Sequence, residues 1–424
     1  MSLITNLTRM WLTRSVKPFT FTNEYDSVLP FENAENLGLY VHIPFCKSIC
    51  SFCPYCKILY DKELLDRYID YLLQEIHLVG KNLSEKNLSE KKRVTSLYFG
   101  GGTPALAVER IGEIIQALEE YFEISQGVGL ELHPSNVTAE ILLKLKKAGV
   151  TKISIGIQSF QEKFQNILGR KAVDTLALKK ALEAVPFETV SMDFIFALPN
   201  QTFEDLKSDI DTAFLVGANH IAVYPFIDFT FTKSKVRAMK KKEKRKLLDD
   251  ITLYCYEKGY ERDSIWTFSK EKGAKYSSMT RENFLGFGAS ATTLLRNQFK
   301  INTFSVEEYI KRIESKTLPT SLTIRFSERQ RMIYWLFWTA YTTKVQERDF
   351  EKFFKVPLKK MYGKELRLAR KLGFVTYEKD KGEYKMTLKG AFYYHYYENY
   401  YTLSYIDKMW GIMRKVAFPE KIEF

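Results

Sequence analysis

Residues 39–56 read LYVHIPFCKSICSFCPYC, an apolar run followed by a dense group of cysteines. Four of the chain's five cysteines fall within eleven positions of this stretch, namely Cys46, Cys50, Cys53 and Cys56. So many thiols in so short a stretch are typical of a soft-metal site, because thiolates are the ligands that such metals prefer. Cysteines placed this unevenly do not suit a disulfide framework, and we interpret the fifth, Cys255, as a core thiol.

The spacing of the first three cysteines, C-x3-C-x2-C, narrows the choice of metal. Three neighbouring thiolates can hold three irons of a 4Fe–4S cluster and leave the fourth iron free for another ligand. Zinc is the main alternative, since four cysteines could close a tetrahedral site. Structural zinc sites usually use two C-x2-C pairs set well apart, whereas here all the thiols lie in one loop. The spacing therefore favours the iron–sulfur cluster.

The composition is that of a globular protein. The chain has 424 residues, of which 45% are hydrophobic and 27% charged, enough for one large domain and a smaller one. No apolar run approaches about 18 residues, so no membrane span is expected. The N-terminal stretch is basic but lacks the apolar core of a signal peptide, so we expect a cytoplasmic protein.

Positive charge is concentrated toward the end of the chain. The net charge is +13, and from Ser321 onward 21 Lys and Arg face 12 Asp and Glu. Such a surplus suits an anionic partner, which could be a nucleic acid, an acidic membrane surface or a polycarboxylate substrate. The alternative is a lysine-rich solvated surface with no partner.

Short apolar runs alternate with amphipathic stretches through the first half of the chain. The predicted strands are 39–43, 95–100, 128–133, 152–157, 189–195 and 220–224, and the predicted helices include 62–80, 110–122, 139–147 and 203–216. Successive strand–helix units indicate an α/β fold with a parallel sheet or barrel. In parallel barrels the chemistry lies at the carboxyl ends of the strands, and the cysteine group follows the first predicted strand.

The pattern changes near Leu318. Three predicted helices, 329–341, 347–354 and 358–372, precede two strands around an Asp-Lys-Gly turn, which resembles a winged helix. The tail 392–405 has seven tyrosines and is expected to pack a helix against a neighbour. Two polar runs are read as surface features, 84–93 as a loop and 240–246 as the solvated start of a helix.

Several motifs in the sequence resemble those of a known family. C-x3-C-x2-C with Phe52 before its third cysteine resembles the radical S-adenosylmethionine (SAM) signature. YVHIPFC is similar to the opening of the family that contains oxygen-independent coproporphyrinogen III oxidase and heme chaperones. Further motifs follow in that family's order: FGGGTP (99–104), GLELHP (129–134), SIGIQSF (154–160), GRK (169–171), SMDFIFALPNQT (191–202) and FLGFGASA (284–291). The resemblance covers roughly residues 39–300.

The resemblance implies a fold and a division of the chain. We expect a partial (β/α)6 radical SAM barrel over residues 38–300, preceded by an N-terminal arm, residues 1–37. Residues 301–424 would form a smaller C-terminal winged-helix-like α+β domain that covers the active site.

The resemblance also implies site residues. Cys46, Cys50 and Cys53 would hold a 4Fe–4S cluster. SAM would be bound by Tyr40, Phe52, Gly101, Gly102, Thr103, Glu131, Gln158, Arg170 and Asp193. Any one of these polar residues taken alone could instead be a structural or surface group. Cys56 lies outside the implied ligand set and is interpreted as a spare thiol, and His42, His133 and His220 are interpreted as structural.

The implied activity is reductive cleavage of SAM to a 5′-deoxyadenosyl radical. The radical would act on an anionic, tetrapyrrole-like small molecule, as in coproporphyrinogen III oxidase, with an electron donor such as flavodoxin or ferredoxin. The alternatives are a family methyltransferase that uses two SAM molecules and a heme chaperone. A regulator that binds DNA through the basic helix 358–372 is a weaker alternative. Nucleic acid is not an expected partner.

Three departures from the family pattern bear on the substrate. Residues 1–37 lack the R-Y-T-S-Y-P-like stretch of coproporphyrinogen oxidases. Ala197 and Asn200 stand where the family's G-L-P-G-Q-T has glycines. The region before FLGFGASA reads KYSSMTREN and lacks the H-N-x-x-Y-W of heme chaperones. The substrate and the oligomeric state are not specified by the sequence.

Overall fold

The computed structural model describes residues 3–84, 91–270 and 282–424. Its centre is six neighbouring parallel strands in the order β11-β10-β9-β8-β6-β2. They are β2 (Leu37–Ile43), β6 (Leu97–Gly101), β8 (Val128–Leu132), β9 (Lys152–Gln158), β10 (Thr189–Phe196) and β11 (His220–Pro225). Every predicted strand is present, with ends shifted by at most about two residues. The predicted α/β fold with a partial (β/α)6 barrel is confirmed.

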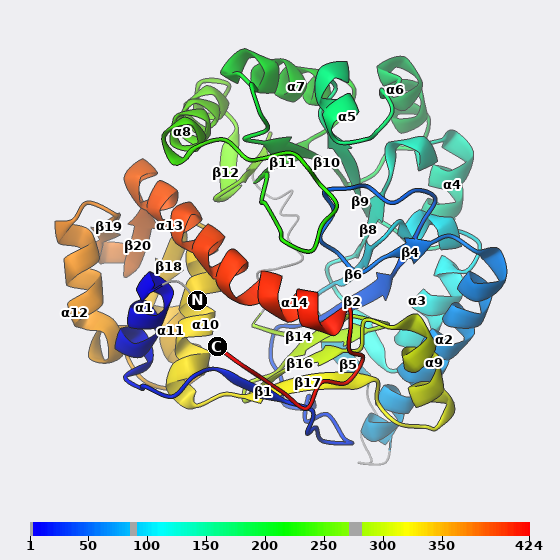
Figure 1. Ribbon diagram of the computed structural model, residues 1–424, viewed down its shortest axis with the longest axis horizontal. Coiled ribbons are helices and arrows are strands. Elements are labelled where there is room, and N and C mark those ends of the chain that lie inside the picture. The colour runs from blue at the N-terminus through cyan, green and yellow to red at the C-terminus, as the bar shows by residue number, and fades with distance from the viewer. Residues whose placement is uncertain (1–2, 85–90, 271–281) are drawn as a thin grey trace.

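Helices cover the outer face of these strands (Figure 1). They are α2 (Lys62–Ser84), α3 (Ile111–Glu119), α4 (Ala139–Lys147), α5 (Glu162–Ile167), α6 (Thr175–Ala184), α7 (Phe203–Leu215) and α8 (Lys241–Glu257), with short 3-10 turns at Pro104–Ala107 and Pro134–Asn136. The hydroxyl of Thr138 caps α4, whose Leu142 and Leu145 are buried, so one face of the helix is apolar and packs inward. The basic run 240–246 forms the start of α8, as predicted, and Cys255 is a buried core thiol.

Further strands extend the parallel set into one sheet of fourteen strands among the described residues. Beyond β11 lie β13 (Thr267–Ser269) and β12 (Glu261–Ser264). Beyond β2 lie β14 (Asn283–Phe287), β15 (Thr292–Leu294), β16 (Gln298–Asn302), β17 (Thr320–Arg325), β1 (Thr20–Thr22) and β21 (Lys421–Glu423). Two small pairs lie outside this sheet: β3 (Phe45–Cys46) with β4 (Ile58–Leu59), and β5 (Lys92–Val94) with β7 (Phe122–Ile124). Most of the predicted loop 84–93, residues 85–90, lies outside the described residues.

The predicted domain limits at residues 37 and 300 do not coincide with breaks in the sheet. The limit at residue 300 falls inside β16, which pairs with β15 on one side and β17 on the other. The arm 1–37 is also part of the fold, because β1 joins β17 to β21 and because α1 (Leu3–Thr13) packs on two C-terminal helices. Pairing between antiparallel strands that are distant in sequence leaves no signal in the local residue pattern. The predicted limits therefore took no account of this pairing.

The C-terminal part matches the predicted arrangement of three helices and a hairpin. α10 (Glu328–Tyr341), α11 (Glu347–Phe354) and α12 (Leu358–Lys371) precede β19 (Val375–Glu378) and β20 (Glu383–Met386), and β18 (Lys344–Gln346) completes a three-stranded sheet. Gly382, at φ +60°, makes the turn before β20, where glycine adopts the left-handed conformation freely. These helices and strands enclose an apolar cluster of their own, centred on Trp335 and Phe350. The arrangement is winged-helix-like.

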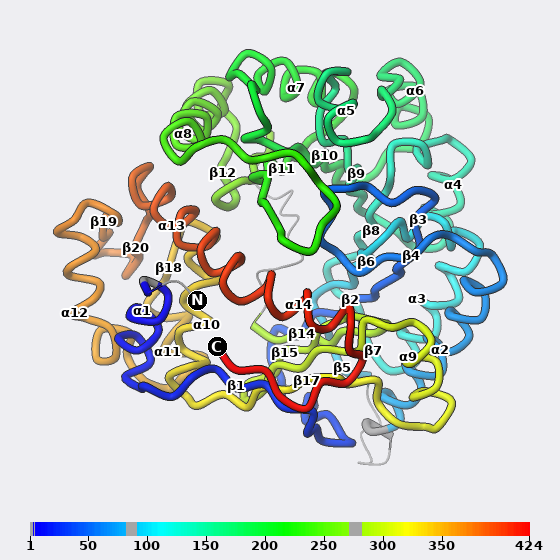
Figure 2. The backbone as a smooth tube through the Cα atoms, viewed as in Figure 1, coloured from blue at the N-terminus to red at the C-terminus, as the bar shows by residue number. Residues whose placement is uncertain are grey.

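A long helical segment then crosses in front of the strand ends (Figure 1). It comprises α13 (Leu388–Tyr401), a π-helical turn η4 (Thr402–Ile406) and α14 (Asp407–Met413). Its tyrosines pack against a neighbouring helix, as predicted, since Phe337 of α10 stacks on Tyr394 with ring centroids 5.0 Å apart. The loop after β11 reaches this segment (Figure 2), where Asp407 accepts two hydrogen bonds of 2.7 Å from Thr230.

The main core lies between the parallel strands and α2, α3, α4, α6, α7 and α8. A second cluster joins β16, β17, β1 and β21 to α14. α9 (Val306–Glu314) packs against α2 on the outside. Within the described ranges, no helix combines the length and the apolar character needed to cross a membrane.

Candidate functional site

All twelve residues expected to hold the cluster and SAM line one cavity, of about 1190 Å³. It opens at the carboxyl ends of the parallel strands and is closed on the far side by residues of the C-terminal helices. We call the first side the barrel wall, formed by residues of β2 to β11 and the loops that follow them. We call the second side the C-terminal wall, formed by residues of α10, α13, η4 and α14.

The cysteines stand on a loop that begins at the end of β2. The loop is anchored at both ends, because β3 pairs with β4 and because the Tyr60 N–H donates to the Cys46 carbonyl over 2.9 Å. Cys46, Cys50 and Cys53 are half-buried and face the cavity. Thr103 Oγ1 lies 3.9 Å from the Cys46 sulfur.

The donor set fits a multinuclear iron–sulfur cluster better than a single ion. Within residues 3–84, 91–270 and 282–424, no three His, Cys, Asp or Glu side chains converge closely enough to hold one metal ion. Burial raises the pKa of Cys46 to about 11 and also raises that of Cys50, so without a metal these groups are neutral thiols. A bound soft metal deprotonates its thiol ligands. Three half-buried thiols around one loop therefore suit a cluster, and this is not the geometry of a closed zinc site.

Glycines let the end of β6 approach the cysteine loop. The Gly102 N–H donates to the Ile43 carbonyl and the Thr103 N–H to the Phe45 carbonyl, both over 2.8 Å. A Cβ on Gly102 would lie 2.5 Å from the Phe45 carbonyl oxygen, and Gly101 has a φ of +118° with the His42 ring against it. Glycine at position 102 thus allows the close approach of two protein backbones, and the binding of SAM by Gly101 and Gly102 stays a prediction.

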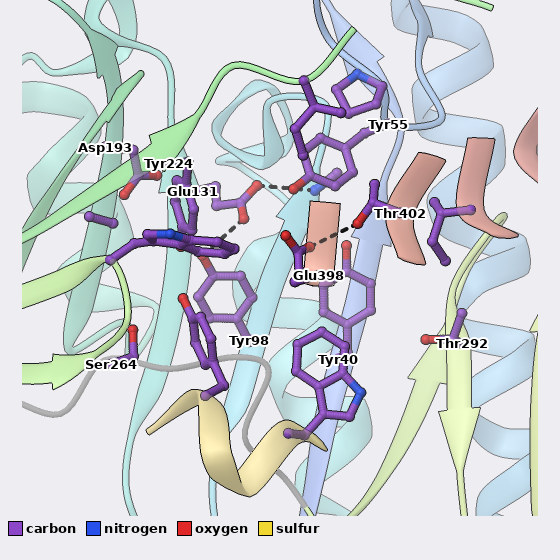
Figure 3. A pocket seen from close by; sticks show the side chains of 18 of the residues that line it. Tyr40, Tyr55, Tyr98, Glu131, Asp193, Tyr224, Ser264, Thr292, Glu398 and Thr402 are labelled. Carbon is purple, nitrogen blue, oxygen red and sulfur yellow. Dashed lines mark hydrogen bonds between the residues drawn. The ribbon is translucent and has the colours of Figure 1, made fainter. Parts of the chain in front are cut away.

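Two half-buried carboxyl groups face the cavity from β8 and β10, which lie on either side of β9 (Figure 3). Glu131 accepts hydrogen bonds from the Tyr98 hydroxyl, at 2.9 Å, and from the Gly101 N–H, at 3.2 Å. Asp193 accepts from Ser154 Oγ, which lies 3.0 Å from both carboxyl oxygens. Burial and the charge of Glu131 raise the pKa of Asp193 to about 7, and burial raises that of Glu131. The barrel wall therefore offers half-buried acceptors to a polar ligand.

Gln158 and Arg170 complete the polar part of the barrel wall. Gln158 ends β9 with a φ of +72°, a conformation that strains a residue with a Cβ and is often found at functional sites. Arg170 donates to the Gly156 carbonyl over 2.7 Å. Burial lowers the pKa of Arg170, while Cys50, Cys53 and Cys46 raise it, which puts its guanidinium near all three thiols. The cysteine loop is thus flanked by a cation.

The two positions where the family has glycines keep the left-handed backbone conformation that glycine adopts most easily. Ala197 has a φ of +69° and Asn200 a φ of +60°. Asparagine tolerates this region, whereas alanine pays about 1 kcal/mol for it. The loop after β10 therefore keeps the backbone conformation that glycines would allow, despite the two substitutions.

The aromatic and histidine side chains have structural partners. The Tyr40 hydroxyl is 2.9 Å from His42 Nδ1, and Phe52 packs against the apolar cluster of Phe226. Burial lowers the pKa of His42, His133 and His220 to about 4, so all three rings are neutral near pH 7. All three rings line the cavity, and their interpretation as structural residues stays a prediction.

Cys56 is buried, and its thiol donates to the Phe304 carbonyl over 3.3 Å. Its backbone carbonyl lies 3.1 Å from His42 Nε2. Burial has the largest of several effects on the pKa of the Cys56 thiol, and it raises that pKa. It lines the cavity beside Cys46, Cys50 and Cys53, but it packs into an apolar group with residues of the C-terminal segment.

The sequence predicted that the C-terminal region covers the site, but not which of its residues face the cavity; this C-terminal wall is mainly aromatic. Its rings include Phe337, Trp338, Tyr341, Tyr397, Tyr401 and Tyr405, and Tyr224 and Trp266 face them from β11 and the turn before β13. Glu398 brings a carboxyl group into this wall (Figure 3), where Thr402 donates to it over 2.8 Å and burial raises its pKa to about 7. The tyrosine-rich tail was the only available signal, and it carries no information about which rings face the cavity.

The charge of the cavity is balanced. Among the described residues, seven acidic and seven basic side chains line it. From the last 104 residues, where the basic surplus lies, the lining takes one base, Lys344, and three acids, Asp349, Glu383 and Glu398. The surplus of positive charge is therefore located elsewhere on the molecule.

Comparison with known proteins agrees with this geometry. Residues 40–213 match the Radical SAM superfamily. The chain is 27% identical over 297 residues to the heme chaperone HemW of Bacillus subtilis, covering 66% of this chain and 76% of that protein. It is 27% identical over 311 residues to the oxygen-independent coproporphyrinogen III oxidase of Cereibacter sphaeroides, covering 67% of this chain and 68% of that protein.

A solved structure matches nearly the whole chain. Coproporphyrinogen III oxidase (HemN) from Escherichia coli, described as a radical SAM enzyme, covers 89% of this chain and 93% of its own at a TM-score of 0.74 and 20% identity. At that identity the match establishes the fold. The resemblance drawn from the sequence motifs is confirmed.

Proposed function

Since residues 40–213 carry a radical SAM domain and the chain resembles the coproporphyrinogen III oxidase and heme chaperone family, we propose that it is a radical SAM enzyme. The observation that carries this proposal is the single cavity shared by the C-x3-C-x2-C loop, the glycine turn and two half-buried carboxyl groups. Cys46, Cys50 and Cys53 would hold a 4Fe–4S cluster. When bound, the cluster and SAM would supply a 5′-deoxyadenosyl radical.

The barrel wall would bind and orient SAM. Glu131 and Asp193 present acceptors to hydroxyl and amino groups, and Arg170 presents donors to a carboxylate. Both acids are already held by hydroxyl and N–H donors on neighbouring strands, so they need little rearrangement to act as acceptors. The winged-helix-like region and the crossing helices would cover the site and exclude water.

The substrate would be a flat or macrocyclic small molecule, with a tetrapyrrole as the first candidate. Two observations support this: the rings of the C-terminal wall can stack on a flat ligand, and several relatives are named as coproporphyrinogen III oxidases. The balanced charge of the cavity adds no support for a polycarboxylate. An external one-electron donor, such as flavodoxin or ferredoxin, and a cytoplasmic location remain predictions.

Heme binding without turnover is the second candidate function. It is favoured by the similarity to HemW of Bacillus subtilis and of Lactococcus lactis, both of which are named heme chaperones. The region in which the sequence lacks the chaperone motif includes residues 275–281, which lie outside the described residues. A methyltransferase using two SAM molecules is a third candidate with no specific support.

The central test is SAM cleavage. Anaerobically reconstituted protein with dithionite should convert SAM to 5′-deoxyadenosine and methionine, slowly even without its substrate, as measured by mass spectrometry. Coproporphyrinogen III is then added, and a mass loss of carboxyl groups supports the oxidase. Heme that binds without any stimulation of 5′-deoxyadenosine release supports the chaperone. A reconstituted cluster that never cleaves SAM would contradict the enzyme proposal.

The C-terminal wall is tested by titrating the full chain with coproporphyrin III and with heme. Tyr401→Ala should weaken binding about tenfold, because its ring lines the cavity and packs 5.6 Å from Phe337. The control is Tyr393→Ala, on the same helix but exposed and outside the lining. Substitution is preferable to truncation near Leu318, which would remove β17 from the sheet. Equal affinity of the two variants would contradict the assigned role of this wall.

A further inference from the structure

The end of α14 contacts the loop that carries the third and fourth cysteines. Arg414, the residue that follows α14, donates a hydrogen bond from Nη2 to the Pro54 carbonyl, across 360 positions of sequence. One helical turn earlier, Trp410 packs on Tyr55 with ring centroids 6.0 Å apart. Both contacts fall between Cys53 and Cys56, so the crossing segment touches the cysteine loop itself and not only the cavity rim.

Aromatic rings fix the position of the Arg414 guanidinium. Its central carbon lies 4.7 Å from the centre of the Phe231 ring and 5.7 Å from that of Phe304. Phe304 also accepts the thiol of Cys56 through its carbonyl, and its ring lies 6.2 Å from Trp410. The guanidinium is therefore held against the loop by two rings and a carbonyl, a geometry that suits arginine because its planar cation stacks on aromatic faces.

The charge of Arg414 is not neutralised locally. Within the described part of the chain, no carboxylate forms an ion pair with it, and its hydrogen-bond acceptor is an uncharged carbonyl. Arginine keeps its charge at all ordinary pH values. The C-terminal segment thus brings a fixed positive charge to the Cys53 side of the loop, while Arg170 lies near the thiols from the barrel.

A fixed cation beside an iron–sulfur site favours its reduced form. One-electron reduction adds one unit of negative charge to the cluster and its thiolates, and net charge and solvent exposure are among the factors that set the potential of such clusters. No bond forms or breaks, and the electron comes from an external one-electron reductant. Lys57 is also near, but it belongs to the loop and donates to the Cys53 carbonyl, so it reports nothing about the C-terminal segment.

We propose that Arg414 is a positioning residue that makes the cluster easier to reduce when α14 is seated on the cysteine loop. This inference rests on the proposed function, because it requires that Cys46, Cys50 and Cys53 hold a 4Fe–4S cluster. The C-terminal segment would then do more than cover the cavity. It would also place a positive charge beside the residues that would hold the cluster.

The test is the midpoint potential of the reconstituted full chain, followed by electron paramagnetic resonance during titration with dithionite. Arg414→Gln should lower the ratio of reduced to oxidised cluster about fivefold at a fixed potential, as expected for one partly screened charge. This corresponds to about 40 mV at 59 mV per tenfold. Arg414→Lys, which keeps the charge, should recover most of the shift, and the effect of Arg414→Gln should shrink at high salt.

Lys415→Gln is the matched control, because it removes the same charge one residue further along and, among the described residues, its side chain forms no hydrogen bond or ion pair with the loop. It should leave the ratio within about twofold. Equal shifts in Arg414→Gln and Lys415→Gln would overturn the inference, as would an unchanged potential in Arg414→Gln. In both cases four irons per chain and intact SAM cleavage would leave the proposed function standing. A wild-type chain that takes up no 4Fe–4S cluster would overturn both.

Discussion

The two walls of the cavity are built by different means. Residues of the barrel wall come from short motifs at the ends of consecutive parallel strands, so chain order alone brings them together. Residues of the C-terminal wall come from helices that reach the same space across hundreds of positions. The first wall presents carboxyl groups, hydroxyls and thiols, and the second presents rings. The difference teaches that a polar cofactor site can be read from local motifs, whereas the surface facing it depends on long-range packing.

The largest expected effect falls on the cysteine loop. Cys46→Ala, Cys50→Ala and Cys53→Ala should each abolish the cluster, since each would remove one of three iron ligands. Cys56→Ala should retain it, because that thiol donates to the Phe304 carbonyl in the apolar packing of the C-terminal segment. Iron and sulfide analysis after anaerobic reconstitution measures this. Loss of the cluster in Cys56→Ala would contradict the assignment of Cys56 to the packing of the C-terminal segment alone.

The next effect concerns the pH dependence of stability in the barrel wall. Asp193 has a pKa of about 7 in the folded chain and 3.8 ordinarily, so between these values the folded state retains a proton that the unfolded state releases. Stability contributed by this group is therefore lost as the pH rises from 4 to 7, by up to about 4 kcal/mol as an upper bound. Asp193→Asn should remove this loss. Urea unfolding of the apo chain at pH 5 and pH 8 checks it, and a wild-type loss between the two pH values that persists unchanged in the variant would contradict it.

Gly102→Ala should come third, at about 1–3 kcal/mol. Its Cβ would meet the Phe45 carbonyl oxygen at 2.5 Å, so the cysteine loop or β6 must shift. Cluster content should fall together with thermal stability. Gly112→Ala is the control, because its Cβ would meet nothing closer than 3.8 Å. If Gly102→Ala keeps full stability but loses SAM binding, the glycine serves the cofactor directly and not the backbone contact.

The smallest effect should be equal in the two regions. Thr202 at the start of α7 and Ser327 at the start of α10 both form capping boxes, with Asp205 and Gln330 as the reciprocal partners. Thr202→Ala and Ser327→Ala should each cost about 1 kcal/mol. Neither should change cluster content. Thermal unfolding and iron analysis measure both, and an unequal cost above about 1 kcal/mol would show that one region is less able to compensate.

The sequence predicted the parallel strands and the barrel-wall residues because hydrophobic periodicity and short motifs are local signals. Its errors have the opposite character. α3 ends at Glu119 instead of Phe122, because Phe122 begins β7 and pairs with β5. The predicted limit at residue 300 falls inside β16, which pairs on both sides. Tyr401 and Glu398 of the C-terminal wall were not identified, since a tyrosine-rich helix gives no sign of which side faces a cavity.

The pairing of β1 with β17 and β21 has a consequence for how the chain is made. Thr22 lies opposite Thr323 and opposite Lys421. A ribosome adding about 5–20 residues per second needs roughly 15–60 s after completing β1 before β17 exists. During that interval the strand has neither neighbour, so its backbone groups stay available to chaperones or to wrong partners. We expect slow, late completion of this sheet edge, well after the parallel strands have formed.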